Sequence, residues 1–146
     1  MVFNAYARYY DLLYQDKDYT GEVNYIASHI RESNPDGKTI LELGCGTGVH
    51  AEHLARLGFT VHGVDMSQEM LDRAEQRRQG LPDEVAERLS FSLGDVRTVR
   101  TGETYDVVME FQTVPAANLV NPAFRFGVSR PLGDQAIAEA VTAAEN

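Results

Sequence analysis

Three glycines within five residues follow a short, mostly apolar segment, and this arrangement restricts the fold more than any other part of the chain. The segment Thr39–Leu43 leads directly into a loop that contains Gly44, Gly46 and Gly48. Apolar residues at helical spacing come next, and Gly58 is a typical stop signal for a helix. The pattern predicts a strand, a glycine loop and a helix. The loop then lies at the carboxyl end of the strand, where an open α/β sheet binds its ligands.

The same unit recurs along the chain. Thr60–Val64 predicts a second strand that ends at Asp65, and Ser67 can cap the helix that follows it. A third strand is predicted at Leu89–Leu93 and a fourth at Tyr105–Met109. Strands that alternate with helices pair in parallel through right-handed crossovers. Up to residue 111, the sequence therefore predicts an α/β fold with a doubly wound, mostly parallel sheet.

A single domain is expected for residues 1–146, since this length allows one compact core. Residues 1–36 carry four early tyrosines and then a helical pattern, and we interpret them as an N-terminal helical lid. Residues 37–111 form the ligand-binding core, whereas residues 112–146 depart from the alternating pattern. In this last segment only Phe124–Val128 could supply another strand, before an alanine-rich stretch with a helical pattern.

Asp65 stands 21 positions after Gly44, at the end of the second predicted strand. A carboxylate at this point can accept hydrogen bonds from the hydroxyls of a ribose, which favours ligands of the adenosine type. The dinucleotide fingerprint Gly-x-Gly-x-x-Gly requires its third glycine at the position of Val49, but here that glycine comes one residue early, at Gly48. A nicotinamide dehydrogenase is therefore disfavoured, and a tight structural turn without a ligand is the other alternative.

Residues 40–48 and 61–67 together resemble the first two motifs of the class I S-adenosylmethionine (SAM)-dependent methyltransferases. The segment 93–96, Leu-Gly-Asp-Val, resembles the next motif of that family. The resemblance implies a Rossmann-like fold and SAM as the cofactor. It implies that the glycine loop passes under the methionine part of the cofactor and that the acid at the end of the second strand binds the ribose. The residue after this acid and the residues of the third motif then lie at the adenine. The residues concerned are Gly44, Cys45, Gly46, Gly48, Asp65, Met66, Asp95 and Val96.

Glu42 is a carboxylate on an otherwise apolar strand, so it should lie near a group that satisfies it. In the related enzymes it faces the glycine loop and the amino group of the cofactor; an edge-facing strand residue is the alternative. The stretch from Tyr9 to Tyr14 resembles the lid of amino-sugar N-methyltransferases and glycine methyltransferases. That resemblance makes Tyr14 our first candidate for a contact with the cofactor carboxylate and Tyr9 the second, with simple core packing as the alternative.

Charge and composition exclude several classes of partner. Lys and Arg total 13 against 22 Asp and Glu, which gives a net charge of -9 that repels the phosphates of nucleic acids. The single cysteine, Cys45, forms no intrachain disulfide, and no apolar run reaches the roughly 20 residues that cross a bilayer. We therefore expect a cytoplasmic protein without nucleic-acid or membrane partners. His50 and His53 are expected on a solvated helix face and not as metal ligands.

These features predict SAM-dependent methyl transfer to a small-molecule acceptor, with an amine as the expected acceptor group. No catalytic residue stands out, and Glu110, His62 and the lid tyrosines are the candidates for a proton acceptor. The alternative is a shortened SAM-binding domain without catalytic activity or one completed by another chain.

The resemblance covers residues 6–111, because the remaining 35 residues are too few for the further strands and helices of the family. The sheet would then be incomplete on its C-terminal side. Its fourth strand would then be an apolar edge strand, whose unpaired backbone groups can form hydrogen bonds with another strand. We expect the C-terminal segment to cover this edge, or a second subunit to cover it in a homodimer.

Overall fold

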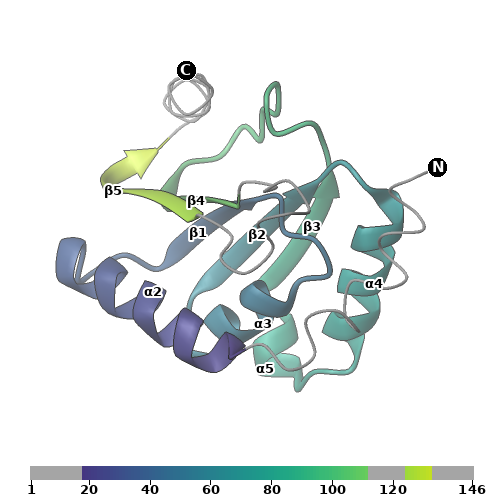
Figure 1. Cartoon of the computed structure of the whole chain (residues 1–146), viewed down its shortest axis with the longest axis horizontal. Helices are drawn as coiled ribbons and strands as arrows, with labels where there is room; N and C mark the ends of the chain where they lie inside the picture. Colours follow the sequence, from purple (N-terminus) through teal and green to yellow (C-terminus); the bar gives the residue numbers. More distant parts are fainter. Residues whose placement is uncertain (1–17, 112–123, 133–146) are drawn as a thin grey trace.

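The computed structural model describes residues 18–111 and 124–132, which form one open sheet with helices packed against it (Figure 1). Side chains are described up to residue 109. In chain order the elements are α2 Tyr19–Ser33, β1 Thr39–Leu43, α3 Val49–Arg56, β2 Thr60–Asp65, α4 Gln68–Gln79, α5 Asp83–Ala86, β3 Leu89–Leu93, β4 Tyr105–Phe111 and β5 Phe124–Leu132. The predicted strands and the helices between them are confirmed within the described part of the chain.

The sheet has the strand order β3-β2-β1-β4-β5. Strands β1 to β4 pair in parallel, and β5 runs antiparallel to β4. Starting from β1, the chain winds outward to β2 and β3 and then returns to place β4 on the other side of β1. Consequently, the carboxyl ends of β1 and β4 lie at the point where the winding direction reverses, and open α/β sheets bind their ligands there.

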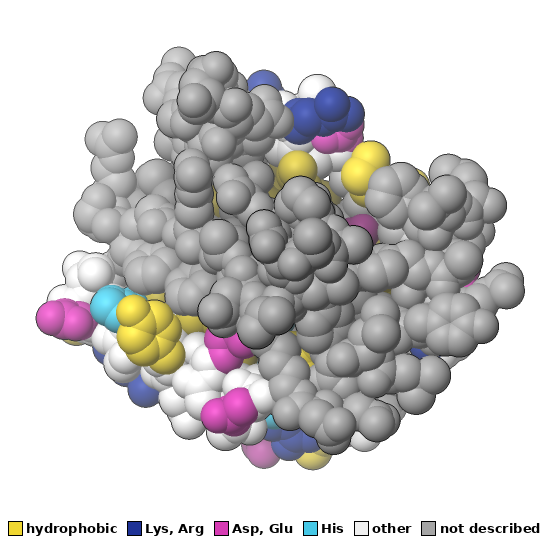
Figure 2. Space-filling view, viewed as in Figure 1, with side chains coloured by type: hydrophobic (Ala, Val, Ile, Leu, Met, Phe, Trp, Pro, Cys, Tyr) yellow, Lys and Arg dark blue, Asp and Glu magenta, His cyan; other side chains and the backbone are white. Residues whose placement is uncertain are grey.

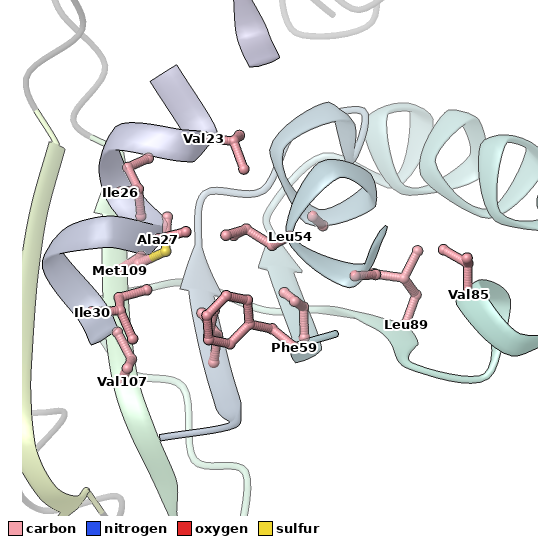
Figure 3. Close-up of a cluster of buried hydrophobic side chains, with 14 residues drawn as sticks. Val23, Ile26, Ala27, Ile30, Leu54, Phe59, Val85, Leu89, Val107 and Met109 are labelled. Atoms are coloured by element: carbon pink, nitrogen blue, oxygen red, sulfur yellow. The ribbon is translucent and has the colours of Figure 1, made fainter. Parts of the chain in front are cut away.

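The two faces of the sheet have separate cores. On one face, α2, α3 and α5 pack on the strands; Figure 3 shows Ile26, Ile30 and Leu54 among the side chains of this first core. On the other face, the connection between β3 and β4 supplies Val96 and Val99 to a second apolar cluster. The connections from β1 to β2 and from β2 to β3 cross one face of the sheet, and the connection from β3 to β4 crosses the other face. This arrangement confirms the doubly wound topology.

Helix boundaries follow from capping groups and from apolar spacing. The Asp18 carboxylate accepts a hydrogen bond from the Gly21 amide (2.9 Å) at the start of α2. At the start of α4, the Ser67 hydroxyl accepts one from the Met70 amide (3.3 Å), as its position in the sequence predicts. Each of these caps satisfies a backbone amide that has no partner within its helix.

The edge of β4 is covered by β5, which confirms the prediction that the C-terminal segment lies there (Figure 1). The new strand is longer than the five residues expected, since it extends from Phe124 to Leu132. Its pairing with β4 contains an irregularity between Tyr105 and Val107. The predicted helix near the C-terminus lies outside the described residues, as do Tyr9 and Tyr14 of the lid.

Candidate functional site

The glycine loop makes a tight bend at the carboxyl end of β1. Gly44, Gly46 and Gly48 have φ angles of 77°, 56° and 80°, all in the left-handed region. A residue with a β-carbon adopts this conformation at a cost of about 1–2 kcal/mol. The Gly44 and Cys45 amides both donate to the carbonyl of Val64 on β2, at 2.7 and 3.1 Å. The loop is thereby attached to the neighbouring strand.

Asp65 joins three segments at this end of the sheet. Its Oδ2 accepts a hydrogen bond from the Gly46 amide (2.9 Å), and its Oδ1 accepts one from the Ser67 amide (2.9 Å). Its carbonyl accepts a third bond from the Gly94 amide (3.0 Å), just after β3. A carboxylate has about four lone-pair positions, so both oxygens of this half-buried group keep the capacity to accept further hydrogen bonds.

One glycine of the loop and one on the neighbouring strand leave little room for a side chain. A β-carbon on Gly48 would lie 3.1 Å from Phe91 and 3.2 Å from Ala74. One on Gly63, in the middle of β2, would lie 2.8 Å from both Cys45 and Phe91. Sequence reasoning missed Gly63, although a glycine inside a strand signals a close approach of another segment.

Glu42 is fully buried, with 0% of its surface exposed. In the described part of the chain neither carboxyl oxygen has a hydrogen-bond partner. Burial, and secondarily the charge of Asp65, raise the pKa of Glu42 to about 8. On the adjacent strands its register partners are Gly63 and Met109, which carry no charge. Because an unpaired buried carboxyl is costly, its position beside the glycine loop points to a ligand group that completes the site.

Cys45 lies inside the loop and is 5% exposed, as a small buried residue. Burial raises the pKa of its thiol well above the usual value, and the nearby carboxyl groups of Glu42 and Asp65 raise it further. The thiol therefore stays protonated, which is the unreactive form. Its packing against Gly63 gives it a structural role in the shape of the loop.

Two apolar side chains are exposed at the ends of neighbouring strands. Met66, which follows β2, is 56% exposed, and Leu93, the last residue of β3, is 58% exposed. Adjacent exposed apolar side chains of this size are well suited to contact the faces of a flat ligand ring. Leu93 was not among the predicted site residues, although it belongs to the third motif.

Asp95 carries an ion pair with Arg97, the nearest atoms being 2.6 Å apart. Hydrogen bonds from the Arg97 side chain and backbone lower the pKa of Asp95 to about 2. Since the pair is exposed to solvent, water screens the attraction and the guanidinium can be displaced. The neighbouring Val96 turns its side chain into the second core. The expected approach of an adenine amino group to Asp95 thus competes with Arg97.

His62 lies on the face of the sheet opposite to Glu42. Its two ring nitrogens are 2.7 and 2.8 Å from the hydroxyl oxygens of Ser90 and Ser92 on β3. Partial burial lowers the pKa of this histidine. With both nitrogens engaged in the middle of a strand, His62 is not brought together with the glycine loop and Asp65.

The prediction of a solvated helix face is wrong for His50. This side chain is 6% exposed because α2 packs over α3, and its Nε2 lies 3.0 Å from Oε1 of Glu22. The ring of Tyr19 contacts it edge-on, with centroids 5.1 Å apart. His53 is partly exposed and stacks on the same tyrosine. The two histidines connect α3 with α2.

Two other kinds of feature, a metal site and a membrane-spanning helix, are absent from the described residues. In residues 18–111 and 124–132, no group of three or more His, Cys, Asp or Glu side chains could hold a metal ion. Over the same ranges, none of the helices has the length and apolar character needed to traverse a bilayer.

Comparison with known proteins identifies the family. A family model described as a methyltransferase domain matches residues 40–125, which include the glycine loop, Asp65 and Asp95. The chain belongs to the class I methyltransferases. Within the methyltransferase domain, the match begins on β1 and extends into β5.

Curated relatives of this methyltransferase domain include an N,N-dimethyltransferase of dTDP-3-amino-3,4,6-trideoxy-alpha-D-glucopyranose from Streptomyces venezuelae. It is 34% identical over 71% of this chain. The cypemycin N-terminal methyltransferase from a Streptomyces species is 40% identical over 60% of the chain. The aligned parts make up only 41% and 32% of these relatives, so the chain spans well under half of their length.

Solved structures show the same fold. The SAM-bound amino pentose methyltransferase of calicheamicin biosynthesis from Micromonospora echinaspora matches with a TM-score of 0.61 and 32% identity. The match covers 77% of this chain and 44% of that protein. A methyltransferase from Clostridium acetobutylicum matches with a TM-score of 0.55 and 30% identity, over 74% of this chain and 43% of the other.

Proposed function

We propose that this methyltransferase domain binds SAM at the carboxyl ends of β1 and β2 and transfers its methyl group to an amine of a small molecule. The observation that carries the proposal is the 2.9 Å hydrogen bond between the Gly46 amide and the Asp65 carboxylate. Two segments that resemble separate motifs of SAM enzymes thereby meet at one place.

The chemistry of the site fits SAM. Methionine carries an ammonium group, and the sulfonium of SAM carries a second positive charge. Glu42, buried without a hydrogen-bond partner among the described residues, offers an unused acceptor, and a positively charged group bound beside it would favour its ionised form. The positive φ angle of Gly48 and the crowding of a β-carbon there by Phe91 and Ala74 favour glycine at this position, and the backbone of the loop then serves as the floor on which the ligand lies.

We assign the residues of the site as follows. The loop holds the methionine part, Asp65 accepts hydrogen bonds from the ribose hydroxyls, and Met66 packs on the adenine. Exposure of Met66 and Leu93 at adjacent strand ends supports an adenine position between these strands. Asp95 and the Val96 amide receive the edge of the ring, and Tyr14 in the lid contacts the carboxylate. The full set is Tyr14, Glu42, Gly44, Cys45, Gly46, Gly48, Asp65, Met66, Asp95 and Val96.

When bound, SAM supplies a methyl group on a positively charged sulfur. The residues of the chain then have two tasks, which are to hold the cofactor in one orientation and to keep water away from it. Asp65 and the backbone of the glycine loop perform the first task, and the buried packing around Cys45 and Gly63 supports it. No general base is assigned among the described residues.

An amine is the proposed acceptor because several relatives are named for amine methylation. The Streptomyces venezuelae relative acts on an amino sugar nucleotide and the cypemycin enzyme on a peptide N-terminus. The net charge of -9 and the single cysteine support a cytoplasmic protein without nucleic-acid partners. Where described residues are visible in Figure 2, basic side chains lie at separate places with acidic side chains beside them.

Methyl transfer is tested with SAM carrying a labelled methyl group and a panel of amines that includes dTDP-amino sugars and peptide N-termini. Label should appear on at least one acceptor. Asp65→Asn should weaken binding of S-adenosylhomocysteine at least tenfold, by calorimetry, because it removes a charged acceptor. Asp72→Asn, on the exposed side of α4, is the matched control and should bind normally. Binding without transfer to any acceptor would select the binding domain without catalysis, and absence of both would contradict the proposal.

A further inference from the structure

Arg77 reaches from α4 to the glycine loop. Its Nε donates a hydrogen bond of 3.0 Å to the carbonyl oxygen of Thr47, the residue between Gly46 and Gly48. Thr47 is 1% exposed, so its carbonyl lies away from solvent. Arg77 itself is not part of any motif that the sequence pointed to. Its contact connects positions 30 residues apart in the chain.

Glu52 on α3 holds the Arg77 guanidinium in place. Arg77 Nη1 lies 3.5 Å from one oxygen of this carboxylate. The other oxygen accepts a hydrogen bond of 3.2 Å from Arg56. The charge of Arg77 is thereby compensated close to the loop, where its side chain is 28% exposed. A paired and partly buried guanidinium has less freedom than one extending into water.

Arg77 and Asp65 together orient two peptide units of the loop. The Thr47 carbonyl and the Gly48 amide belong to the same planar peptide unit. That unit is bonded at both ends, since the Gly48 amide donates to the Cys45 carbonyl (3.1 Å) while Arg77 holds the Thr47 carbonyl. The peptide unit before Gly46 is held through its amide by Asp65. Asp65 acts from β2 and Arg77 from α4.

Helix α4 also lies against the loop at Ala74, one helical turn before Arg77. Ala74 precedes Arg77 by three residues, so both lie on the same face of the helix. A β-carbon on Gly48 would lie 3.2 Å from that of Ala74. The helix therefore touches the loop at two points, an apolar contact below Gly48 and the hydrogen bond to Thr47.

We propose that Arg77 is a positioning residue that sets the shape of the glycine loop and thereby the affinity for the cofactor without touching it. This inference rests on the proposed SAM site. Loss of the guanidinium removes this charged donor from the buried Thr47 carbonyl, and the peptide unit is then held less firmly, although the bond from the Gly48 amide to the Cys45 carbonyl stays. The effect appears in cofactor binding, because the loop is the surface on which the cofactor lies.

The test compares Arg77→Met with Arg78→Met in the full chain. Arg78 is the neighbouring residue and makes the same kind of contact, donating to the carbonyls of Ala86 and Leu89 at 3.1 Å each, away from the loop. Arg77→Met should raise the Kd for S-adenosylhomocysteine about tenfold, the effect of one lost charged hydrogen bond. Arg78→Met should lower the melting temperature but keep the Kd within about twofold of the unsubstituted chain, because its partners lie outside the site.

Two further readouts separate positioning from general stability. Arg77→Lys keeps a donor, so its Kd should lie between those of the unsubstituted chain and Arg77→Met. Where turnover is measurable, KM for SAM should rise in Arg77→Met while kcat changes less than about twofold. Equal Kd values in all variants, or losses of affinity that follow the loss of stability in both Arg77→Met and Arg78→Met, would overturn the inference.

Failure of the proposed function would be recognised separately. If the unsubstituted chain does not bind S-adenosylhomocysteine, the proposed function is wrong. Hydrogen exchange at residues 46–49 then decides whether Arg77 shapes the loop. Faster exchange of these amides in Arg77→Met than in Arg78→Met would support the positioning role, and equal exchange would reject it.

Discussion

At the scale of single residues, Glu42 combines an ionisable group with a fully apolar position. Its neighbours across the sheet are Gly63 and Met109, and the charge of Asp65, which also raises its pKa, has the same sign. Such a group is more easily protonated in the folded chain than in the unfolded one. Folding and proton binding are therefore linked.

The stability of the chain without ligand should fall as Glu42 ionises. The pKa of Glu42 is about 8 in the folded state against 4.5 as the ordinary value, so the folded state binds more protons between these limits. The free energy of unfolding should fall with increasing pH in this window, by up to about 1.4 kcal/mol per pH unit. The measurement is urea unfolding at intervals across the window.

Comparison with Glu42→Gln isolates this group, since the amide does not titrate. The pKa of His62 is lowered, so this residue changes the free energy of unfolding with pH in the opposite direction. Its stabilising effect is lost as the pH falls below its ordinary pKa of 6.5. That contribution is present in both proteins and cancels in the difference. A difference between the two chains that stays constant across the window would show that Glu42 does not titrate there.

Gly48 should tolerate alanine less well than Gly58. Both have positive φ angles, 80° and 102°, and both alanine variants incur backbone strain of about 1–2 kcal/mol. A β-carbon at Gly58 meets nothing within 4 Å, whereas one at Gly48 meets Phe91 and Ala74. Overpacking should add about 1–3 kcal/mol at Gly48. Unfolding by denaturant measures both losses, and equal values would contradict the packing at Gly48.

At the scale of elements, β1 and β4 are joined at the end of the sheet opposite to the site. Asp106 Oδ2 accepts hydrogen bonds from the Lys38 and Thr39 amides at 2.7 and 3.0 Å. The Asp106 amide in turn donates to the Thr39 hydroxyl oxygen at 2.9 Å. These bonds align the starts of two parallel strands, and the same alignment sets where their carboxyl ends meet.

Asp106→Ala should destabilise the fold by about 1–3 kcal/mol, because two backbone amides lose their acceptor. Asp72→Ala is the control, since Asp72 makes one exposed contact with Gln68 and its loss should cost under about 0.5 kcal/mol. Hydrogen bonds lower the pKa of Asp106, so its stabilising effect is present above 3.8 and is lost as the pH falls through the lowered value. Thermal unfolding of both variants measures the difference, and equal losses would contradict a role in strand alignment.

At the scale of the whole molecule, the site is built by the winding of the chain and belongs to no single element. The loop after β1, the end of β2 and the segment after β3 meet because the three strands are parallel neighbours. Binding at such a place connects several elements at once. A ligand should therefore stabilise the folded state as a whole.

S-adenosylhomocysteine at 100 times its Kd should stabilise the chain by about 2.7 kcal/mol, which raises the melting temperature by several degrees. NADH at the same concentration should leave it unchanged, because Val49 occupies the place of the third dinucleotide glycine. Differential scanning calorimetry distinguishes the two ligands. A larger increase in melting temperature with NADH than with S-adenosylhomocysteine would favour the alternative of a nicotinamide dehydrogenase.

The strands, the glycine loop and the position of Asp65 at the end of a strand could be recognised in the sequence, since each depends on local pattern. Apolar periodicity, glycine spacing and capping residues act within about 20 residues of one another. All the predicted cofactor contacts, those of Asp65, Met66, Asp95 and Tyr14 among them, remain predictions. The burial of His50 against Glu22 could not be predicted, because the pattern of α3 does not show which helix packs over it.

The sequence by itself determined the order of elements and the end of the sheet at which the glycine loop lies. Only the tertiary structure decided that Glu42 lies without a partner in the described part of the chain, that Gly63 makes room for Cys45, and that Arg77 holds the loop. These features depend on contacts between residues far apart in the chain. Such contacts are set by how the strands pair and the helices pack, and a local sequence pattern carries no record of them.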